Sequence, residues 1–108
     1  TDGLPLAIED MYLPAERFPA LAELDMNNRS IYATLEKLYD AQPQEARDVV
    51  SAGSATRDQA GLLGINKGAP VMCIQRTSTD HHGLPVEFSR VVFHAERYQF
   101  VARMRRAG

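Results

Sequence analysis

The chain has 108 residues, 44% of them hydrophobic and 24% charged, which is the composition of one soluble globular domain. The net charge of −2 argues against nucleic-acid binding by these residues, and the only basic cluster is Arg103, Arg105 and Arg106 near the end. The single cysteine, Cys73, excludes an intrachain disulfide, and we expect a buried structural thiol. No apolar run reaches the roughly 18 residues of a membrane span, so a cytoplasmic protein without membrane contact is expected.

A strand is expected first, over residues 4–13. Alternation places Ala7 and Glu9 on one face and Ile8 and Tyr12 on the other. Glu9 puts a carboxylate into an otherwise apolar run. It must therefore face water, a partner charge or a ligand.

Helical segments are expected next. One or two helical turns are expected over residues 16–24, with Phe18 and Leu21 directed inward. A helix is predicted over residues 30–39, because Ser30 is a favoured N-cap. The expected buried stripe of that helix consists of Ile31, Leu35, Leu38 and Tyr39.

The second half of the chain is predicted to hold a strand, a short helix and two more strands. A capping box of Thr56 and Gln59 opens the short helix, which contains Leu62 and Leu63, and Gly64 ends it. These four elements are expected over residues 45–55, 56–64, 71–79 and 83–100, the last with a short break before a second extended segment. The order of elements predicts an α+β fold, a mostly antiparallel sheet with flanking helices on one face.

The strand that begins at residue 83 carries a second carboxylate in an apolar run. Alternation places Glu87, Val91 and Phe93 on one face. Structural ion pairs across the sheet are the alternative for Glu87 and for Glu9, with Arg47, Arg76 and Arg90 as the possible partners.

Two short motifs recur at a constant offset of 80 residues. Gly-Leu-Pro at 3–5 returns at 83–85, and Ala-Glu-Arg at 15–17 returns at 95–97. We interpret them as two copies of one strand-containing unit. The first copy lacks a preceding strand, so the chain is expected to be a fragment of a longer protein.

The helix start at Ser30 is a candidate binding site. Free N–H groups and the positive end of the helix dipole suit anions, and Tyr32 adds a phenol within one turn. The alternative is a plain N-cap beside an interface tyrosine. If Glu9 and Glu87 converge there, the site offers acceptors for hydroxyl or amine groups and donors for an anion, as a small phosphorylated or acidic metabolite requires.

Catalytic and metal-binding motifs are absent from the sequence. It has no glycine-rich phosphate loop, no nucleophile elbow and no zinc-binding helix motif. His81, His82 and His94 are expected to be surface or structural residues. The sequence therefore predicts no enzyme, no metal site and no cofactor.

Several motifs together resemble a known family. Gly-Leu-Pro-Leu-Ala-Ile-Glu at 3–9, Ser-Ile-Tyr at 30–32, Leu-Gly-Ile at 63–65 and Gly-Leu-Pro-Val-Glu-Phe-Ser-Arg at 83–90 are similar to the UTRA effector domain of HutC-branch, GntR-type transcription regulators. The resemblance implies a chorismate-lyase-like fold in which residues 1–108 are the C-terminal part of the effector domain. Its first strands and a winged helix-turn-helix DNA-binding domain are expected to lie outside this chain.

The resemblance also implies roles for particular residues. Ser30 and Tyr32 would help to hold a phosphate, and Glu9 and Glu87 would contact the rest of the ligand. Phe93 stands where the family often has tyrosine, which removes a hydroxyl. A pair of arginines that completes the phosphate site would lie before the first residue.

The favoured hypothesis is a sensor of a small polar metabolite, with a sugar phosphate or amino-sugar phosphate as candidates. Its expected partners are the effector, a second copy in a homodimer, and DNA only through the separate reader domain. Two alternatives remain at this stage: a chorismate-lyase-like enzyme, and a dimerisation module without a ligand.

Overall fold

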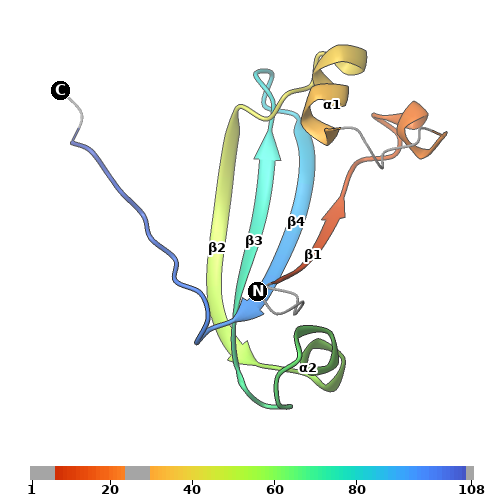
Figure 1. Ribbon diagram of the computed structural model, residues 1–108. Helices are drawn as coiled ribbons and strands as arrows, with labels where there is room; N and C mark the ends of the chain where they lie inside the picture. Colours follow the sequence, from red (N-terminus) through yellow and green to blue (C-terminus); the bar gives the residue numbers. More distant parts are fainter. Residues whose placement is uncertain (1–6, 24–29, 107–108) are drawn as a thin grey trace.

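The computed structural model describes residues 7–23 and 30–106 (Figure 1). Its centre is a four-stranded antiparallel sheet with the strand order β1-β4-β3-β2. The strands are β1 (Ala7–Tyr12), β2 (Glu45–Ser54), β3 (Pro70–Thr79) and β4 (Pro85–His94). The predicted α+β class with an antiparallel sheet is thereby confirmed.

The strand register brings side chains of three strands together on one face of the sheet. Val91 of β4 pairs with Glu9 of β1 on one side and with Ile74 of β3 on the other, while Glu87 pairs with Ser78. Because side chains alternate along each strand, the residues two positions away on each strand share this face. The face is the floor of the site described below.

The helix α1 (Ile31–Tyr39) begins where the sequence predicts, with Ser30 as its N-cap. Leu35 is fully buried with Phe18, which precedes the short 3-10 helix η1 (Pro19–Glu23), and with Val86 of β4. Leu38, expected to be buried, is 50% exposed. The helix lies at the end of the sheet, so only a narrow line of its residues meets other elements.

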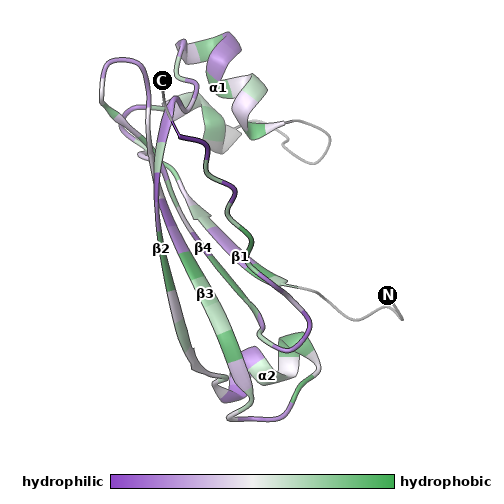
Figure 2. Cartoon of the chain, turned by 90° about the vertical axis from the view of Figure 1, so that its left-hand side faces the viewer, coloured by the Kyte–Doolittle hydropathy of each residue, from purple (hydrophilic) through white to green (hydrophobic). Residues whose placement is uncertain are grey.

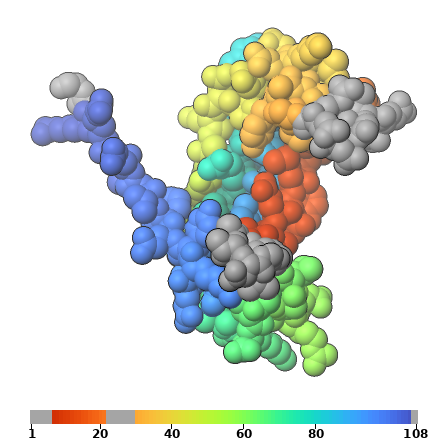
Figure 3. All heavy atoms as spheres, viewed as in Figure 1, coloured from red at the N-terminus to blue at the C-terminus, as the bar shows by residue number. Residues whose placement is uncertain are grey.

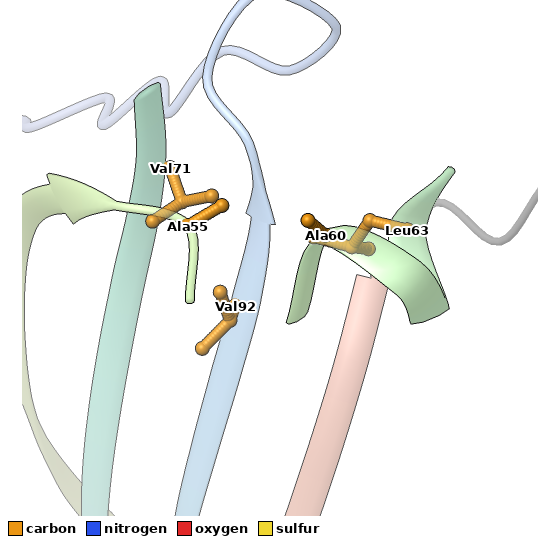
Figure 4. Close-up of a cluster of buried hydrophobic side chains, with 5 residues drawn as sticks. All are labelled: Ala55, Ala60, Leu63, Val71 and Val92. Atoms are coloured by element: carbon orange, nitrogen blue, oxygen red, sulfur yellow. The ribbon is translucent and has the colours of Figure 1, made fainter. Parts of the chain in front are cut away.

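The helix α2 (Arg57–Leu63) has the predicted capping box, and Gly64 ends it with a φ of 68° that favours glycine. Leu63 packs in a second cluster of buried side chains (Figure 4), whereas Leu62 is 59% exposed. The cluster consists of Ala55, Ala60, Leu63, Val71 and Val92.

The two helices lie at opposite ends of the sheet (Figures 1 and 2). They also meet opposite faces, because Tyr32 of α1 donates to Glu87 on the face of Val91, whereas α2 packs on Val71 and Val92 of the other face. The prediction that the helices gather on one face is therefore wrong. The lengths of the helices explain why each one stays at its end of the sheet. Helices of nine and seven residues are about 14 Å and 11 Å long, whereas ten-residue strands span about 33 Å. Each helix therefore covers only the end of the sheet where its own connections leave it.

The two copies of the repeated unit have corresponding turns after their strands. Arg17 N–H donates to the carbonyl of Pro14, and Arg97 N–H donates to that of His94, both at 3.1 Å. The Arg17 side chain then bridges the two copies, since its guanidinium donates to the carbonyl of Pro85 at 2.5 Å and to the carboxylate of Asp80. The start of the first copy lies outside the described residues.

Acid is expected to destabilise the domain through Asp80. Burial alone would raise the pKa of this carboxyl, but Arg17 and the backbone N–H groups of Leu84 and His82 outweigh burial and lower the pKa to about 2. A carboxyl with a depressed folded pKa contributes stability above its unfolded pKa of about 4, and this contribution is lost as the pH falls toward 2. Urea unfolding at about pH 5 and pH 2.5 measures the loss, and Asp80→Asn should show a smaller pH dependence. An unchanged dependence would contradict this assignment.

The chain after β4 has the expected break, and the extended segment that follows lies outside the sheet. The chain turns at 95–97, and residues 99–106 continue away from the body as an exposed segment outside the sheet (Figure 3).

Within the described residues, none of the helices is long and apolar enough to cross a membrane.

Candidate functional site

A cavity of about 270 Å³ lies on the face of the sheet that Val91 shares with Glu9 and Ile74. Strands β1, β3 and β4 form its floor, and α1 and the segment after β4 supply its sides. Its lining residues are Ala7, Glu9, Tyr32, Ile74, Arg76, Ser89, Val91, Phe93 and Tyr98. The ring of Tyr98 packs on that of Phe93 with centroids 4.6 Å apart. The cavity thus combines aromatic and aliphatic surface with a few polar groups, as small-molecule sites do.

A buried carboxylate lies behind one wall of this cavity. Glu87 is only 3% exposed, and its Oε1 accepts hydrogen bonds from the Tyr32 hydroxyl at 2.7 Å and from the Ser78 hydroxyl at 2.9 Å. Its other oxygen, Oε2, is buried without a hydrogen-bond partner among the described residues. A buried unpaired carboxylate oxygen is costly, so its retention points to a functional use.

Tyr32 is held neutral by its surroundings. Partial burial and the hydrogen bond to the Glu87 carboxylate raise the pKa of the phenol to about 12. Because the hydroxyl proton is engaged by Glu87, Tyr32 presents an oxygen lone pair to the cavity. It can accept a hydrogen bond there from a hydroxyl or an amine.

The Tyr32–Glu87 hydrogen bond is expected to be visible in a tyrosine titration. Of the four tyrosines, one should ionise near pH 12 by ultraviolet absorbance, and Tyr32→Phe should remove that step. In Glu87→Gln the same phenol should ionise at lower pH, because the neighbouring negative charge is gone. A titration unchanged by either substitution would contradict the hydrogen bond.

Arg76 supplies the positive charge of the cavity. Its Nε and Nη2 donate to the two carboxylate oxygens of Asp48, on β2, at 2.8 and 2.9 Å. This paired geometry raises the pKa of Arg76 and lowers that of Asp48. The guanidinium is fixed in direction, and its Nη1 is not used by Asp48, so it remains a donor for an anionic group.

The predicted site residues meet only in part. Glu9, Tyr32 and Phe93 line the cavity, and Glu87 contacts it through Tyr32. Ser30 is not among the lining residues. Its hydroxyl accepts from the Ala33 N–H at 3.3 Å, as an N-cap does.

The alternative of ion pairs across the sheet is wrong for Glu87, whose partners are hydroxyl groups. Three lining residues with polar groups, Arg76, Ser89 and Tyr98, were not among the candidates. Alternation along residues 71–79 places Arg76 on the face of Ile74, and this signal could have found it.

The remaining candidates lie elsewhere. Cys73 is only partly buried, and Arg90 Nε donates to its sulfur at 3.4 Å. His81 and His82 are exposed in the turn between β3 and β4. Over residues 7–23 and 30–106, no three His, Cys, Asp or Glu side chains are grouped so as to hold a metal ion.

Comparison with known proteins places the chain in a family. The model of the UTRA domain matches residues 1–99. The chain belongs to the UTRA domain family. The relatives of this UTRA domain include the HTH-type transcriptional repressor NagR of Bacillus subtilis, 35% identical over 97% of this chain. The regulator Rv0792c of Mycobacterium tuberculosis is 36% identical over 93% of it. The chain spans 43% and 38% of these relatives, respectively.

Solved structures agree with the family assignment. The effector domain of PhnF from Mycobacterium smegmatis has a TM-score of 0.86 at 27% identity, covering 97% of this chain and 64% of that one. The C-terminal domain of Yurk from Bacillus subtilis, with a TM-score of 0.87 at 20% identity, covers 96% of this chain and 72% of that one and supports the fold. The predicted resemblance to effector domains of GntR-type regulators is thus confirmed.

Proposed function

We propose that this UTRA domain is the metabolite-sensing part of a HutC-type transcription regulator. A small polar effector binds in the cavity between β1, β3, β4 and α1. Binding controls the attachment to DNA of a separate N-terminal reader domain. The domain is not an enzyme in this proposal, and the whole protein acts as a cytoplasmic homodimer. The observation that carries it is the buried Glu87 carboxylate, which holds Tyr32 at the cavity wall.

The polar groups of the cavity favour an effector with two different ends. Glu9 and the lone pair of Tyr32 accept hydrogen bonds, which suits hydroxyl or amine groups. Arg76 offers its free donor to a phosphate or carboxylate. A relative named as a probable fructoselysine utilization operon transcriptional repressor is consistent with a sugar-derived ligand. We therefore favour sugar phosphates and amino-sugar phosphates.

Regulation follows from differential affinity. An effector shifts the reader domains only if it binds one arrangement of the whole regulator more tightly than another. The cavity is suited to this role because its lining comes from elements far apart in the sequence, so a ligand that contacts them all changes their relative positions.

The experiment is a thermal-shift screen of the chain with amino-sugar phosphates, other sugar phosphates and small acids such as urocanate. A ligand at 100 times its Kd should add about 2.7 kcal/mol of stability, a shift of several degrees. Glu9→Gln should reduce the shift, whereas Glu36→Gln, an exposed residue of α1 outside the lining, should not. A shift that both variants retain would place the binding site elsewhere.

A further inference from the structure

The cavity between α1 and the sheet is polar at one end and apolar at the other. The strand register orders the lining residues of its floor in three rows that run across β1, β4 and β3. The first row holds Ser89 and Arg76, the second holds Glu9, Val91 and Ile74, and the third holds Ala7 and Phe93. Tyr32 of α1 lies beside the first row, because it bonds to Glu87, two residues before Ser89 on β4. The polar groups therefore gather at the first row, and the third row has none.

An aromatic pair forms the apolar end of the cavity. Tyr98 follows the turn after β4, and this turn lies at the end of the sheet opposite to α1 (Figure 1). The Tyr98 ring packs on that of Phe93 with the centroids 4.6 Å apart, and both residues line the cavity. Phe93 is 3% exposed and Tyr98 is 46% exposed, so a ligand at this end meets mainly the Tyr98 ring. Covering such a ring with an apolar group is favourable.

Backbone hydrogen bonds fix the turn that carries Tyr98. The N–H of Ala95 donates to the carbonyl of Pro70 at 3.0 Å, which ties the turn to the start of β3. The N–H of Arg97 donates to the carbonyl of His94 at 3.1 Å and closes the turn. The aromatic surface is therefore formed before a ligand binds, which lowers the entropic cost of binding.

We propose that the effector carries an apolar group at the end opposite to its anionic group, and that Tyr98 is the residue that selects for it. This inference rests on the proposed function and adds one contact to it. An anion at Arg76 and a hydroxyl or amine at Glu9 account for the first two rows. The third row is four residues further along β4 than the first, about 13 Å away at 3.3 Å per residue. A sugar phosphate without a further substituent leaves the aromatic pair uncovered, whereas one with an aliphatic or aromatic substituent far from the phosphate covers it.

Affinity along a series of alkyl glucoside 6-phosphates tests the inference. The methyl and propyl glucosides share the phosphate and the ring hydroxyls and differ by two methylenes at the end of the sugar opposite to the phosphate. Each buried methylene should lower the Kd about three- to fourfold, so calorimetric titration should give about tenfold tighter binding of the propyl glucoside.

Substitutions of Tyr98 show whether its ring causes this difference. Tyr98→Ala should reduce the ratio of the two Kd values to about twofold or less, because the apolar surface is lost. Tyr98→Phe should retain the ratio, because the ring makes the contact. Tyr12→Ala is the matched control, since Tyr12 is 61% exposed on β1 outside the lining of the cavity, and it should retain the ratio as well.

Fluorine NMR of the chain labelled with 3-fluorotyrosine reports which tyrosines the probe reaches. The four tyrosines are Tyr12, Tyr32, Tyr39 and Tyr98, and only Tyr32 and Tyr98 line the cavity. Propyl glucoside 6-phosphate should shift the signals of these two and leave the other two unchanged.

The outcomes separate the inference from the proposed function. A shift at Tyr32 without one at Tyr98 overturns the inference alone, as does a ratio of Kd values that Tyr98→Ala leaves unchanged or that equals one in the wild type. If no glucoside shifts either signal, the inference is also overturned, and the thermal-shift screen decides the proposed function by itself.

Discussion

Glu87→Gln is expected to weaken effector binding by at least tenfold while increasing the free energy of unfolding of the ligand-free domain by about 1 kcal/mol. The wild-type carboxylate is 3% exposed with one oxygen unpartnered, and removing a buried charge recovers part of its desolvation cost. The hydroxyls of Tyr32 and Ser78 can still donate to the remaining carbonyl oxygen. Calorimetric titration and urea unfolding measure the two effects.

The sign of the change in the free energy of unfolding distinguishes a residue that serves ligand binding from one that serves stability. A residue kept for ligand binding at the expense of stability gives opposite effects on affinity and stability. Glu36→Gln is the matched control, because it makes the same chemical change at an exposed site on α1. If Glu87→Gln lowers the stability and leaves the affinity unchanged, Glu87 is a structural residue.

Leu35→Ala is expected to destabilise the domain by about 3 kcal/mol and to lower the melting temperature by roughly 10–20 °C. Leu35 is fully buried, and its side chain packs with Phe18 and Val86, so truncation leaves a cavity between α1 and the sheet. Because α1 also carries Tyr32, the loss weakens the wall of the site. Chemical and thermal unfolding give the magnitude.

The control for this change is Leu38→Ala. It removes the same atoms three residues later on α1, where the side chain is 50% exposed, and should cost less than about 1 kcal/mol. Equal losses from the two substitutions would mean that the helix presents a different side to the sheet.

Local signals made most of the elements predictable. The N-cap at Ser30 and the capping box at Thr56 each fix a helix start through a side chain within three residues, and the alternation around Glu87 marks a strand. The exposure of Leu38 and Leu62 was not predictable in this way. Both follow from where a short helix rests on the sheet, which depends on contacts distant in sequence.

The site was predictable to a smaller extent. Alternation and the family resemblance together identified Glu9, Tyr32 and Phe93, which line one cavity. The role of Arg76 depends on the register between β2 and β3, which places it opposite Asp48, 28 residues away in the sequence. No short-range pattern contains that register, and the same reason explains why hydroxyl groups rather than an arginine meet Glu87.

The central claim is that a small polar effector binds in the cavity between α1 and the sheet. Chemical-shift mapping of the isotope-labelled chain, titrated with each member of the sugar-phosphate and small-acid panel, tests it most directly. At least one member should shift the backbone amides of Tyr32, Ile74 and Val91, which line the cavity, and leave those of Ser51 and Gly53 on β2 unchanged. Shifts confined to other surfaces, or none with any member of the panel, would contradict the claim.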